Sequence, residues 1–206
     1  MRVLVTGAAG FVGRHLLSAL RTAGHEPLST DSQADPAAGI AALDIGDAGT
    51  VDAAIQRLQP DACIHLAGIA FVPDAARDPL ALDAINVAGT LHVARALLRH
   101  VPRARMLFVS SAQVYGTRNR PGARRETDIP EPASPYAGSK ARAEATLLDL
   151  AARQDLDVVI ARPGNHTGPG QSPKFVAPAF AHALRDFRDG RLPSIAVGNL
   201  DSERDF

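Results

Sequence analysis

The fold is decided near the amino terminus by the stretch RVLVTGAAGFVG, residues 2–13, in which an apolar run leads into three glycines spaced three apart. In a strand–turn–helix unit, Gly7 permits the tight turn, Gly10 the close approach of a pyrophosphate, and Gly13 the close packing of helix on strand. The helix that follows offers its free N–H groups to the phosphates. The spacing G-x-x-G-x-x-G differs from the standard G-x-G-x-x-G, so on the glycines alone an ordinary glycine-rich turn is an equal alternative.

Beyond this turn, short apolar runs alternate with longer amphipathic stretches, which is typical of repeated strand–helix units. Strands are predicted at residues 2–6, 26–31, 39–43, 62–67, 105–110 and 157–162. Helices are predicted at residues 11–23, 48–58, 80–100, 136–154 and 175–189, with long loops at 116–135 and within 163–206. Apolar runs such as 63–67 suit strands that are covered on both faces. The pattern predicts an α/β fold with a Rossmann-type doubly wound parallel sheet.

The composition is that of an ordinary globular chain, since 46% of its 206 residues are hydrophobic and 21% are charged. Basic and acidic residues both number 22, so the net charge of zero provides no long-range attraction to nucleic acid or to an anionic membrane. The single cysteine, Cys63, excludes an internal disulfide. No apolar run reaches the ~18 residues of a membrane span, and a strand from residue 2 leaves no signal peptide, so we expect a cytoplasmic location. The histidines show no metal-ligand spacing, so no metal is expected.

Asp31 lies at the end of the second predicted strand, 18 residues past Gly13. A carboxylate at this place can bind the ribose hydroxyls of an adenosine, and it would repel a 2′-phosphate. Because no arginine lies between residues 29 and 36, NAD(H) is favoured and NADP(H) is the alternative. A solvated loop aspartate is the other interpretation of Asp31. Asp44 and Ile45, after the third predicted strand, are weaker candidates for flanking the adenine.

Tyr136 and Lys140 are four residues apart in a predicted helix, so they share one helical face. A lysine ammonium beside a phenol stabilises the phenolate, and we expect it to lower the phenol's pKa from about 10 toward a usable acid/base. Ser110 and Ser111 end the fifth predicted strand, where a hydroxyl can hydrogen-bond a substrate carbonyl. An exposed helix face is the alternative interpretation, because Y-x-x-x-K is common by chance.

The motifs that carry a family resemblance run along the whole chain. They are TGAAGFVG at 6–13, Asp31, HLAG at 65–68, SSAQVYG at 110–116 and YAGSK at 136–140. Together they resemble the extended short-chain dehydrogenase/reductases, which are the epimerases, dehydratases and reductases of nucleotide-sugars. Three further segments narrow the resemblance to the GDP-sugar branch: ARPGNHTGPGQ at 161–171, FV at 175–176, and VGNLD with RDF at 197–201 and 204–206.

The resemblance implies a role for each matching residue. Tyr136 is the catalytic acid/base, Lys140 supports it and binds the nicotinamide ribose, and Ser111 orients the reacting oxygen. With the residues already named, the expected cofactor-binding set is Gly7, Ala9, Gly10, Phe11, Val12, Gly13, Asp31, Asp44, Ile45, Leu66, Ala67, Gly68, Val109, Tyr136, Lys140, Pro163 and His166. The nucleotide-sugar is expected at Ser111, Gln113, Asn165, Phe175, Val176, Arg191 and Arg204. An NAD(P)-binding Rossmann domain is expected over residues 1–162, and an incomplete, small substrate-binding portion over 163–206.

Gln113 separates the activities within the branch. The dehydratases carry a carboxylate here that removes the C5 proton of a 4-keto sugar, and an amide cannot act as that base. We therefore expect NAD(P)H-dependent reduction of the 4-keto group of a nucleotide-linked 6-deoxyhexose, GDP-4-keto-6-deoxymannose being favoured. A nucleotide-sugar 4-epimerase, a GDP-mannose 4,6-dehydratase and a truncated NAD-binding module without turnover are the alternatives. Gly164 stands where the family usually has a bulky aromatic residue, which leaves the shape of the sugar pocket open.

The last residues, Arg204-Asp205-Phe206, match a segment after which members of the family continue. We therefore expect a truncated reading of a longer enzyme, with apolar surface exposed. The family often pairs the helices predicted at 80–100 and 136–154 across a dimer axis, so a homodimer through these helices is also expected.

Overall fold

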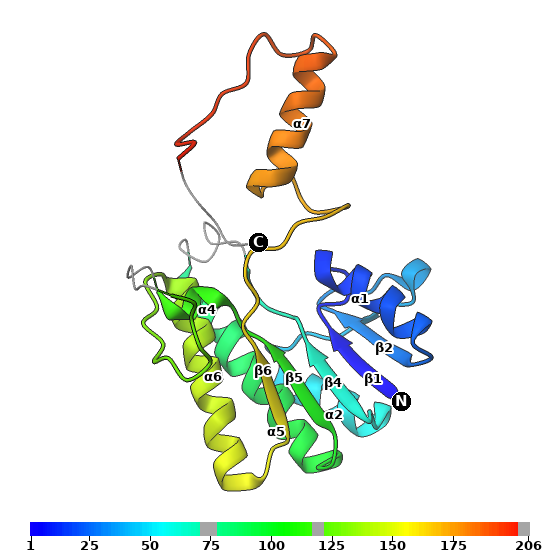
Figure 1. The fold of residues 1–206 in the computed structure, drawn as a ribbon. Helices are drawn as coiled ribbons and strands as arrows, with labels where there is room; N and C mark the ends of the chain where they lie inside the picture. The colour runs from blue at the N-terminus through cyan, green and yellow to red at the C-terminus, as the bar shows by residue number, and fades with distance from the viewer. Residues whose placement is uncertain (71–77, 117–121, 202–206) are drawn as a thin grey trace. The chain divides into compact units, whose positions relative to one another are not determined.

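The computed structural model describes residues 1–70, 78–116 and 122–201. Within these ranges the strands form one parallel sheet in the order β3-β2-β1-β4-β5-β6 (Figure 1). The strands are β1 (Arg2–Thr6), β2 (Glu26–Asp31), β3 (Ala41–Ala42), β4 (Ala62–His65), β5 (Arg105–Val109) and β6 (Val158–Ala161). The strand order runs outward from the neighbours β1 and β4, to β3 on one side and to β6 on the other. The boundary between β1 and β4 is therefore the switch point of a doubly wound sheet. The predicted Rossmann-type α/β fold is therefore confirmed.

Helices follow the strands as the sequence pattern predicts. The α-helices of the described ranges are α1 (Phe11–Thr22), α2 (Ala48–Leu58), α4 (Pro79–Asp83), α5 (Thr90–His100), α6 (Pro135–Gln154) and α7 (Val176–Arg188). Short turns of 3-10 helix lie between β2 and β3, η1 (Pro36–Ala38), and between β5 and α6, η3 (Ala112–Tyr115), and a π-helical turn, η2 (Ala84–Gly89), lies between α4 and α5. The strand predicted at 39–43 shortens to two residues at the sheet edge.

Alternation along β1 shows how the two sides of the sheet are covered. Leu4 points into the larger core, which is built with buried residues of α2, α5 and α6. Val3 and Val5 point to the opposite side and pack with residues of α1. A period of two is what a strand buried on both faces requires. The helices α2, α5 and α6 thus line one side of the sheet, as Figure 1 shows.

The prediction of a single helix at 80–100 is wrong for the middle of the segment, because the π-helical turn η2 separates α4 from α5. A π-helical turn inserts an extra residue and redirects the side chains within it. Here Asn86 is turned inward and buried. Gly89 lies against Ile45, and a Cβ at this glycine would be 2.9 Å from Ile45 Cδ1. The break is thus held by tertiary contacts rather than by local sequence.

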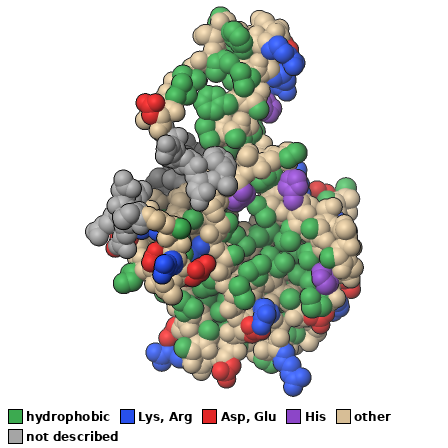
Figure 2. All heavy atoms as spheres, viewed as in Figure 1, with side chains coloured by type: hydrophobic (Ala, Val, Ile, Leu, Met, Phe, Trp, Pro, Cys, Tyr) green, Lys and Arg blue, Asp and Glu red, His purple; other side chains and the backbone are tan. Residues whose placement is uncertain are grey.

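The chain divides into two compact units, Met1–Pro163 and Gly164–Phe206. The first unit contains the sheet, and the second contains α7, none of whose residues is buried. The cofactor and substrate roles expected for the two parts stay predictions. Figure 2 shows hydrophobic side chains gathered over the visible side of β4, β5 and β6. On β6, Val159 is 45% exposed, so apolar surface is open on this face of the first unit.

Candidate active site

The glycine-rich turn between β1 and α1 is packed too tightly for side chains at two of its positions. Gly7 has a φ of +72°, and a Cβ there would lie 2.7 Å from the backbone nitrogen of Ala67. A Cβ at Gly13 would lie 2.5 Å from the carbonyl oxygen of Ala8. Gly10 caps α1 without a side-chain hydrogen bond, so no capping side chain lies over the N-terminus of the helix. This geometry fits a diphosphate at the helix N-terminus.

Asp31 ties this turn to the end of β2. Its Oδ2 accepts a hydrogen bond from the backbone N–H of Ala9 at 2.9 Å, and its Oδ1 accepts one from Ser32 N–H at 2.8 Å. The carboxylate therefore lies beside the glycine-rich turn, where the ribose of a dinucleotide would be expected. Its binding of ribose hydroxyls stays a prediction.

Asp44 and Ile45 differ from each other in exposure. Asp44 is exposed, and its carboxylate accepts a hydrogen bond from Gly46 N–H at 2.8 Å. The side chain of Ile45 is buried in the core, and its carbonyl lies 2.9 Å from His92 Nδ1, which must donate because a carbonyl only accepts. The backbone of Ile45, not its side chain, is what this position can present to a ligand.

The segment after β4 passes close to the lysine of the Y-x-x-x-K motif. Leu66 N–H donates to the carbonyl of Thr6 at 3.1 Å, and Ala67 N–H donates to Thr6 Oγ1 at 3.3 Å. A Cβ at Gly68 would lie 2.8 Å from Asn86 Oδ1 and 3.6 Å from Lys140 Nζ. The missing side chain at residue 68 therefore leaves the lysine uncrowded.

Tyr136 and Lys140 are placed by the start of α6. Ser134 caps this helix by accepting a hydrogen bond from Ala137 N–H at 3.1 Å, and Pro135 occupies the first turn. Tyr136 thus lies in the first turn with Lys140 one turn later, and both side chains are buried. The phenol lies close enough to Ser111, which caps η3 just after β5, for the serine hydroxyl to influence its pKa. The structure brings together the three residues expected to be catalytic, and their roles stay predictions.

Burial dominates the electrostatics of this trio. It raises the pKa of Tyr136, while the nearby Ser111 hydroxyl acts in the lowering direction. It also lowers the pKa of Lys140 to about 8, against the opposing effect of the Glu144 carboxylate. The expectation that the pKa of Tyr136 is lowered is therefore wrong for the chain as described, because desolvation disfavours the phenolate.

The ammonium of Lys140 is engaged on the sheet rather than on the phenol. Its Nζ donates to the carbonyl of Val109 at 2.9 Å and lies 4.9 Å from the centre of the Phe108 ring. Val109, expected in the cofactor-binding set, is thus the last β5 residue and the acceptor for the lysine. The contact fixes Lys140 at the carboxyl end of the sheet.

A buried polar network beneath the trio includes functional residues that the sequence reasoning missed. Asn86 accepts from Ile69 N–H at 2.8 Å and donates to Ser139 Oγ at 3.0 Å, so it joins the π-helical turn to α6. His65 lies between Thr6 Oγ1 and Thr90 Oγ1, at 2.7 and 3.1 Å. Burial lowers the pKa of His65 to about 3, with a smaller contribution from the charge of Lys140. No local pattern revealed Asn86, whereas His65 stands in the HLAG motif at 65–68, to which no role for the histidine was attached.

Gln113 and Pro163 lie beside the trio in the first unit. Gln113 is exposed on η3, and its backbone N–H donates to Ser111 Oγ at 3.2 Å. The carbonyl of Pro163 accepts from Ala112 N–H at 2.9 Å, which ties the chain after β6 to the chain after β5. Both positions are therefore close to Ser111.

The remaining predicted substrate residues belong to the second unit. Arg191 forms ion pairs with Asp186 at 2.6 Å and Asp189 at 2.8 Å, and the Asp186 bond raises its pKa. Four others are exposed or nearly so on the loop before α7 and at its start: Asn165, His166, Phe175 and Val176. Their part in a site stays a prediction, and Arg204 lies outside the described residues.

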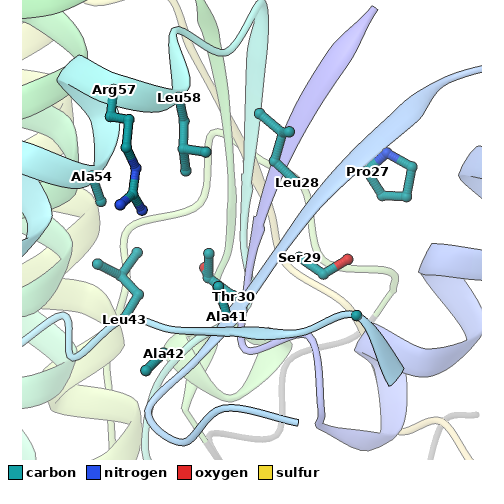
Figure 3. A pocket seen from close by; sticks show the side chains of 11 residues that line it. Pro27, Leu28, Ser29, Thr30, Ala41, Ala42, Leu43, Ala54, Arg57 and Leu58 are labelled. Carbon is teal, nitrogen blue, oxygen red and sulfur yellow. The ribbon is translucent and has the colours of Figure 1, made fainter. Parts of the chain in front are cut away.

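A hollow of about 240 Å³ lies elsewhere, between β2, β3 and α2 (Figure 3). Its walls are mostly apolar, with Arg57 at one side, and none of the side chains drawn there belongs to the expected cofactor or substrate set. Within residues 1–70, 78–116 and 122–201, no three His, Cys, Asp or Glu side chains gather as a metal site would need. No helix in those ranges has the length and apolar character that crossing a membrane requires.

Comparison with known proteins identifies a protein family that this chain matches. The model of the NAD dependent epimerase/dehydratase family matches residues 3–206. Over the whole chain, the sequence is 36% identical to a GDP-6-deoxy-D-mannose reductase of Pseudomonas aeruginosa, of which it covers 66%. Among solved structures it resembles RMD from the same species complexed with NADPH, with a TM-score of 0.77 and 35% identity over 93% of this chain.

A UDP-glucose 4-epimerase of Thermus thermophilus, in complex with NAD, is also similar, with a TM-score of 0.82 and 30% identity over 92% of this chain. The chain covers 63% of that structure and 62% of RMD, so it spans less than two thirds of each of these two proteins. The residues that the family model matches include the strands of the Rossmann-type sheet. This chain belongs to the NAD dependent epimerase/dehydratase family.

Proposed function

We propose that this chain takes part in the NAD(P)H-dependent reduction of the 4-keto group of a nucleotide-linked 6-deoxyhexose, with GDP-4-keto-6-deoxymannose as the substrate. The observation that carries the proposal is the buried trio, in which Tyr136 and Lys140 lie one helical turn apart and Ser111 is close enough to the Tyr136 phenol to influence its pKa. The similarity to a GDP-6-deoxy-D-mannose reductase supports the choice of substrate.

The chain's own residues supply binding, orientation and a proton. The glycine-rich turn would hold the diphosphate of NAD(P)H, and Gly68 leaves room beside Lys140 for the nicotinamide ribose. When bound, the cofactor supplies a hydride to C4 of the sugar. Ser111 orients the C4 oxygen, and Tyr136 donates its phenolic proton to that oxygen as negative charge develops.

Two features favour reduction over dehydration. Gln113 carries an amide, which cannot remove a C5 proton. The raised pKa of Tyr136 keeps the phenol protonated at neutral pH, which is the form that reduction consumes. A 4-epimerase or a 4,6-dehydratase must start by oxidising C4, which requires the phenolate instead.

Cofactor preference follows from the place of Asp31. Its carboxylate lies beside the glycine-rich turn and would favour the ribose hydroxyls of NAD(H) over a 2′-phosphate. The NADPH bound to RMD supports NADP(H) as the alternative. Calorimetric titration with NADH and NADPH decides between them, and tighter binding of NADPH would reject the Asp31 argument.

Two further expectations belong to the proposal: a cytoplasmic location and a homodimer through residues 80–100 and 136–154. Leu80 is 85% exposed and Leu148 54% exposed on these segments, which supports a contact there. Sedimentation analysis of the chain and of Leu148→Lys should show a dimer that the substitution weakens. A monomer at all concentrations would reject the homodimer.

The experiment that tests the function compares two substrates. GDP-mannose alone should yield no product, whereas GDP-4-keto-6-deoxymannose with reduced cofactor should be converted to a GDP-6-deoxyhexose. Turnover of GDP-mannose would reject the reductase. Calorimetry with NADH and then GDP-sugar tests the second candidate, a binding module without turnover, which the lack of any buried residue in α7 favours. Binding of NADH without binding of sugar would support that module.

A further inference from the structure

A buried ion pair connects α6 to the chain after β6. The carboxylate of Glu144 is 3% exposed and the guanidinium side chain of Arg162 is 14% exposed. Arg162 Nη2 donates to Glu144 Oε2 at 2.6 Å, and Arg162 Nε donates to both carboxylate oxygens at 3.0 and 3.1 Å. Such a fork defines the orientation of both groups, and burying it costs more than an exposed pair would. The site described above does not by itself explain why these charges are buried there.

The pair holds the chain on both sides of Ser111. On one side, Ser110 Oγ donates to Glu144 Oε1. On the other side, Arg162 Nη1 donates to the hydroxyl of Tyr115 at 3.0 Å, at the end of the 3-10 turn that Ser111 caps. The guanidinium also lies 4.9 Å from the centre of the Tyr115 ring. Ser111 is thus fixed between two segments that are both bonded to one ion pair.

The same carboxylate lies one helical turn from Lys140. Residues four apart on a helix share a face, with Cβ atoms about 5–6 Å apart. Glu144 raises the pKa of Lys140 against the effect of burial. Among the described residues, His65 of β4 also interacts with the charge of Lys140 and is neutral at ordinary pH, Tyr136 lies one turn away on α6, and Arg162 is bonded to Glu144 itself.

We propose that the Glu144–Arg162 pair is a positioning device for the reaction centre: its carboxylate is the counter-charge one helical turn from Lys140, and the pair together fixes both flanks of Ser111. The inference rests on the proposed function for its meaning in turnover, but the contacts themselves are independent of it. Neither Glu144 nor Arg162 was among the residues expected from the sequence.

Direct titration of Lys140 tests the proposal without cofactor or sugar. The chain has only two lysines, Lys140 and Lys174, so a sample labelled at lysine Cε and Nζ gives two NMR signals, which Lys174→Arg assigns. In Glu144→Gln the carboxylate is lost and Arg162 keeps its charge, so the midpoint of Lys140 should fall by about one pH unit. An unchanged Lys140 midpoint would overturn the proposal.

The chain offers a matched control at the opposite ends of the same two strands. Arg105 starts β5, and its Nε donates to both carboxylate oxygens of Asp157, just before β6, at 3.0 and 2.9 Å. This pair is exposed, with side chains 65% and 44% accessible. Asp157→Asn removes a carboxylate from an arginine fork without approaching Lys140, so the Lys140 midpoint should stay at the wild-type value. A fall as large as that in Glu144→Gln would overturn the proposal.

Two further variants keep the test decisive if Glu144→Gln does not fold. Glu144→Asp retains the charge and should keep the Lys140 midpoint near the wild-type value. Glu144→Gln combined with Arg162→Gln leaves no unpaired buried charge and should still lower the midpoint, by less than the single variant. A folded double variant with an unchanged midpoint contradicts the proposal. Since no ligand is present, a failure of this titration is distinct from a failure to reduce a sugar.

Discussion

At the scale of single residues, the motif of Tyr136 and Lys140 predicts where the two residues lie on a helix, but it does not predict the pKa of the phenol. Their spacing predicted that they share one face of a helix, and both are buried on α6 one turn apart. The expected fall of the Tyr136 pKa did not follow, since burial outweighs the favourable contacts and Lys140 bonds the carbonyl of Val109. Burial depends on residues distant in sequence, such as Leu82, which packs against Tyr136. A protonated phenol is nevertheless the form that a reductase needs.

Replacement of Tyr136 by phenylalanine should remove the proton donor and leave the packing in place. We expect the turnover number to fall by about 10²- to 10⁴-fold, which is the usual contribution of a positioned acid or base. The affinity for NADH should not change, and calorimetry of the same sample provides this internal control. Turnover equal to wild type would show that Tyr136 is not the acid.

His65 makes the chain sensitive to acid in a defined window. Its pKa is about 3 when folded, against about 6.5 in an unfolded chain. Between these values the unfolded state binds one more proton, so stability falls as the pH drops, by about 1.4 kcal/mol per pH unit. Urea unfolding at several pH values should show this slope in wild type and a smaller slope in His65→Gln.

The exposed His15 gives the control for this prediction, because its replacement by glutamine should keep the wild-type slope. Equal slopes in wild type and His65→Gln would contradict the account of the buried network. At neutral pH the His65→Gln variant should also be less stable, since Thr6 and Thr90 lose a shared partner.

At the scale of elements, the first strand, turn and helix were predictable, and the middle of the 80–100 segment was not. Three glycines and an apolar run encode β1 and α1 locally, and the packing at Gly7 and Gly13 agrees with the reason given for each. The π-helical turn η2 depends instead on Asn86 meeting Ile69 and Ser139, which come from other parts of the fold. A periodic pattern contains no sign of such a partner.

A methyl group at Gly13 should disturb the turn that is proposed to hold the diphosphate. Because its Cβ would lie 2.5 Å from the carbonyl of Ala8, α1 must move, at a cost of about 1–3 kcal/mol in stability. We expect Gly13→Ala to lose most of its NADH affinity in calorimetry. Gly24→Ala has open space but a φ of +75°, so it should cost about 1–2 kcal/mol and bind NADH normally. Wild-type NADH affinity in Gly13→Ala would reject the role of the turn.

For the whole molecule, the fold alone does not distinguish a reductase from an epimerase. The chain is as similar in structure to the NAD-bound epimerase, with a TM-score of 0.82, as to RMD, with a TM-score of 0.77. One fold hosts several activities, so the difference must lie in single side chains. In the proposal, Gln113 is the side chain that argues against dehydration, and it belongs to the unit Met1–Pro163. The contribution of the unit Gly164–Phe206 to a sugar site was predicted from motifs and stays to be measured.

The most direct measurement follows a labelled hydride. The chain is mixed with GDP-4-keto-6-deoxymannose and NADH deuterated at C4, each face in turn, and the sugar product is examined by NMR. The account predicts a GDP-6-deoxyhexose with deuterium at C4 of the sugar, and no such product from Tyr136→Phe. NADH that binds without transferring deuterium, or GDP-mannose that is consumed in its place, would contradict the central claim.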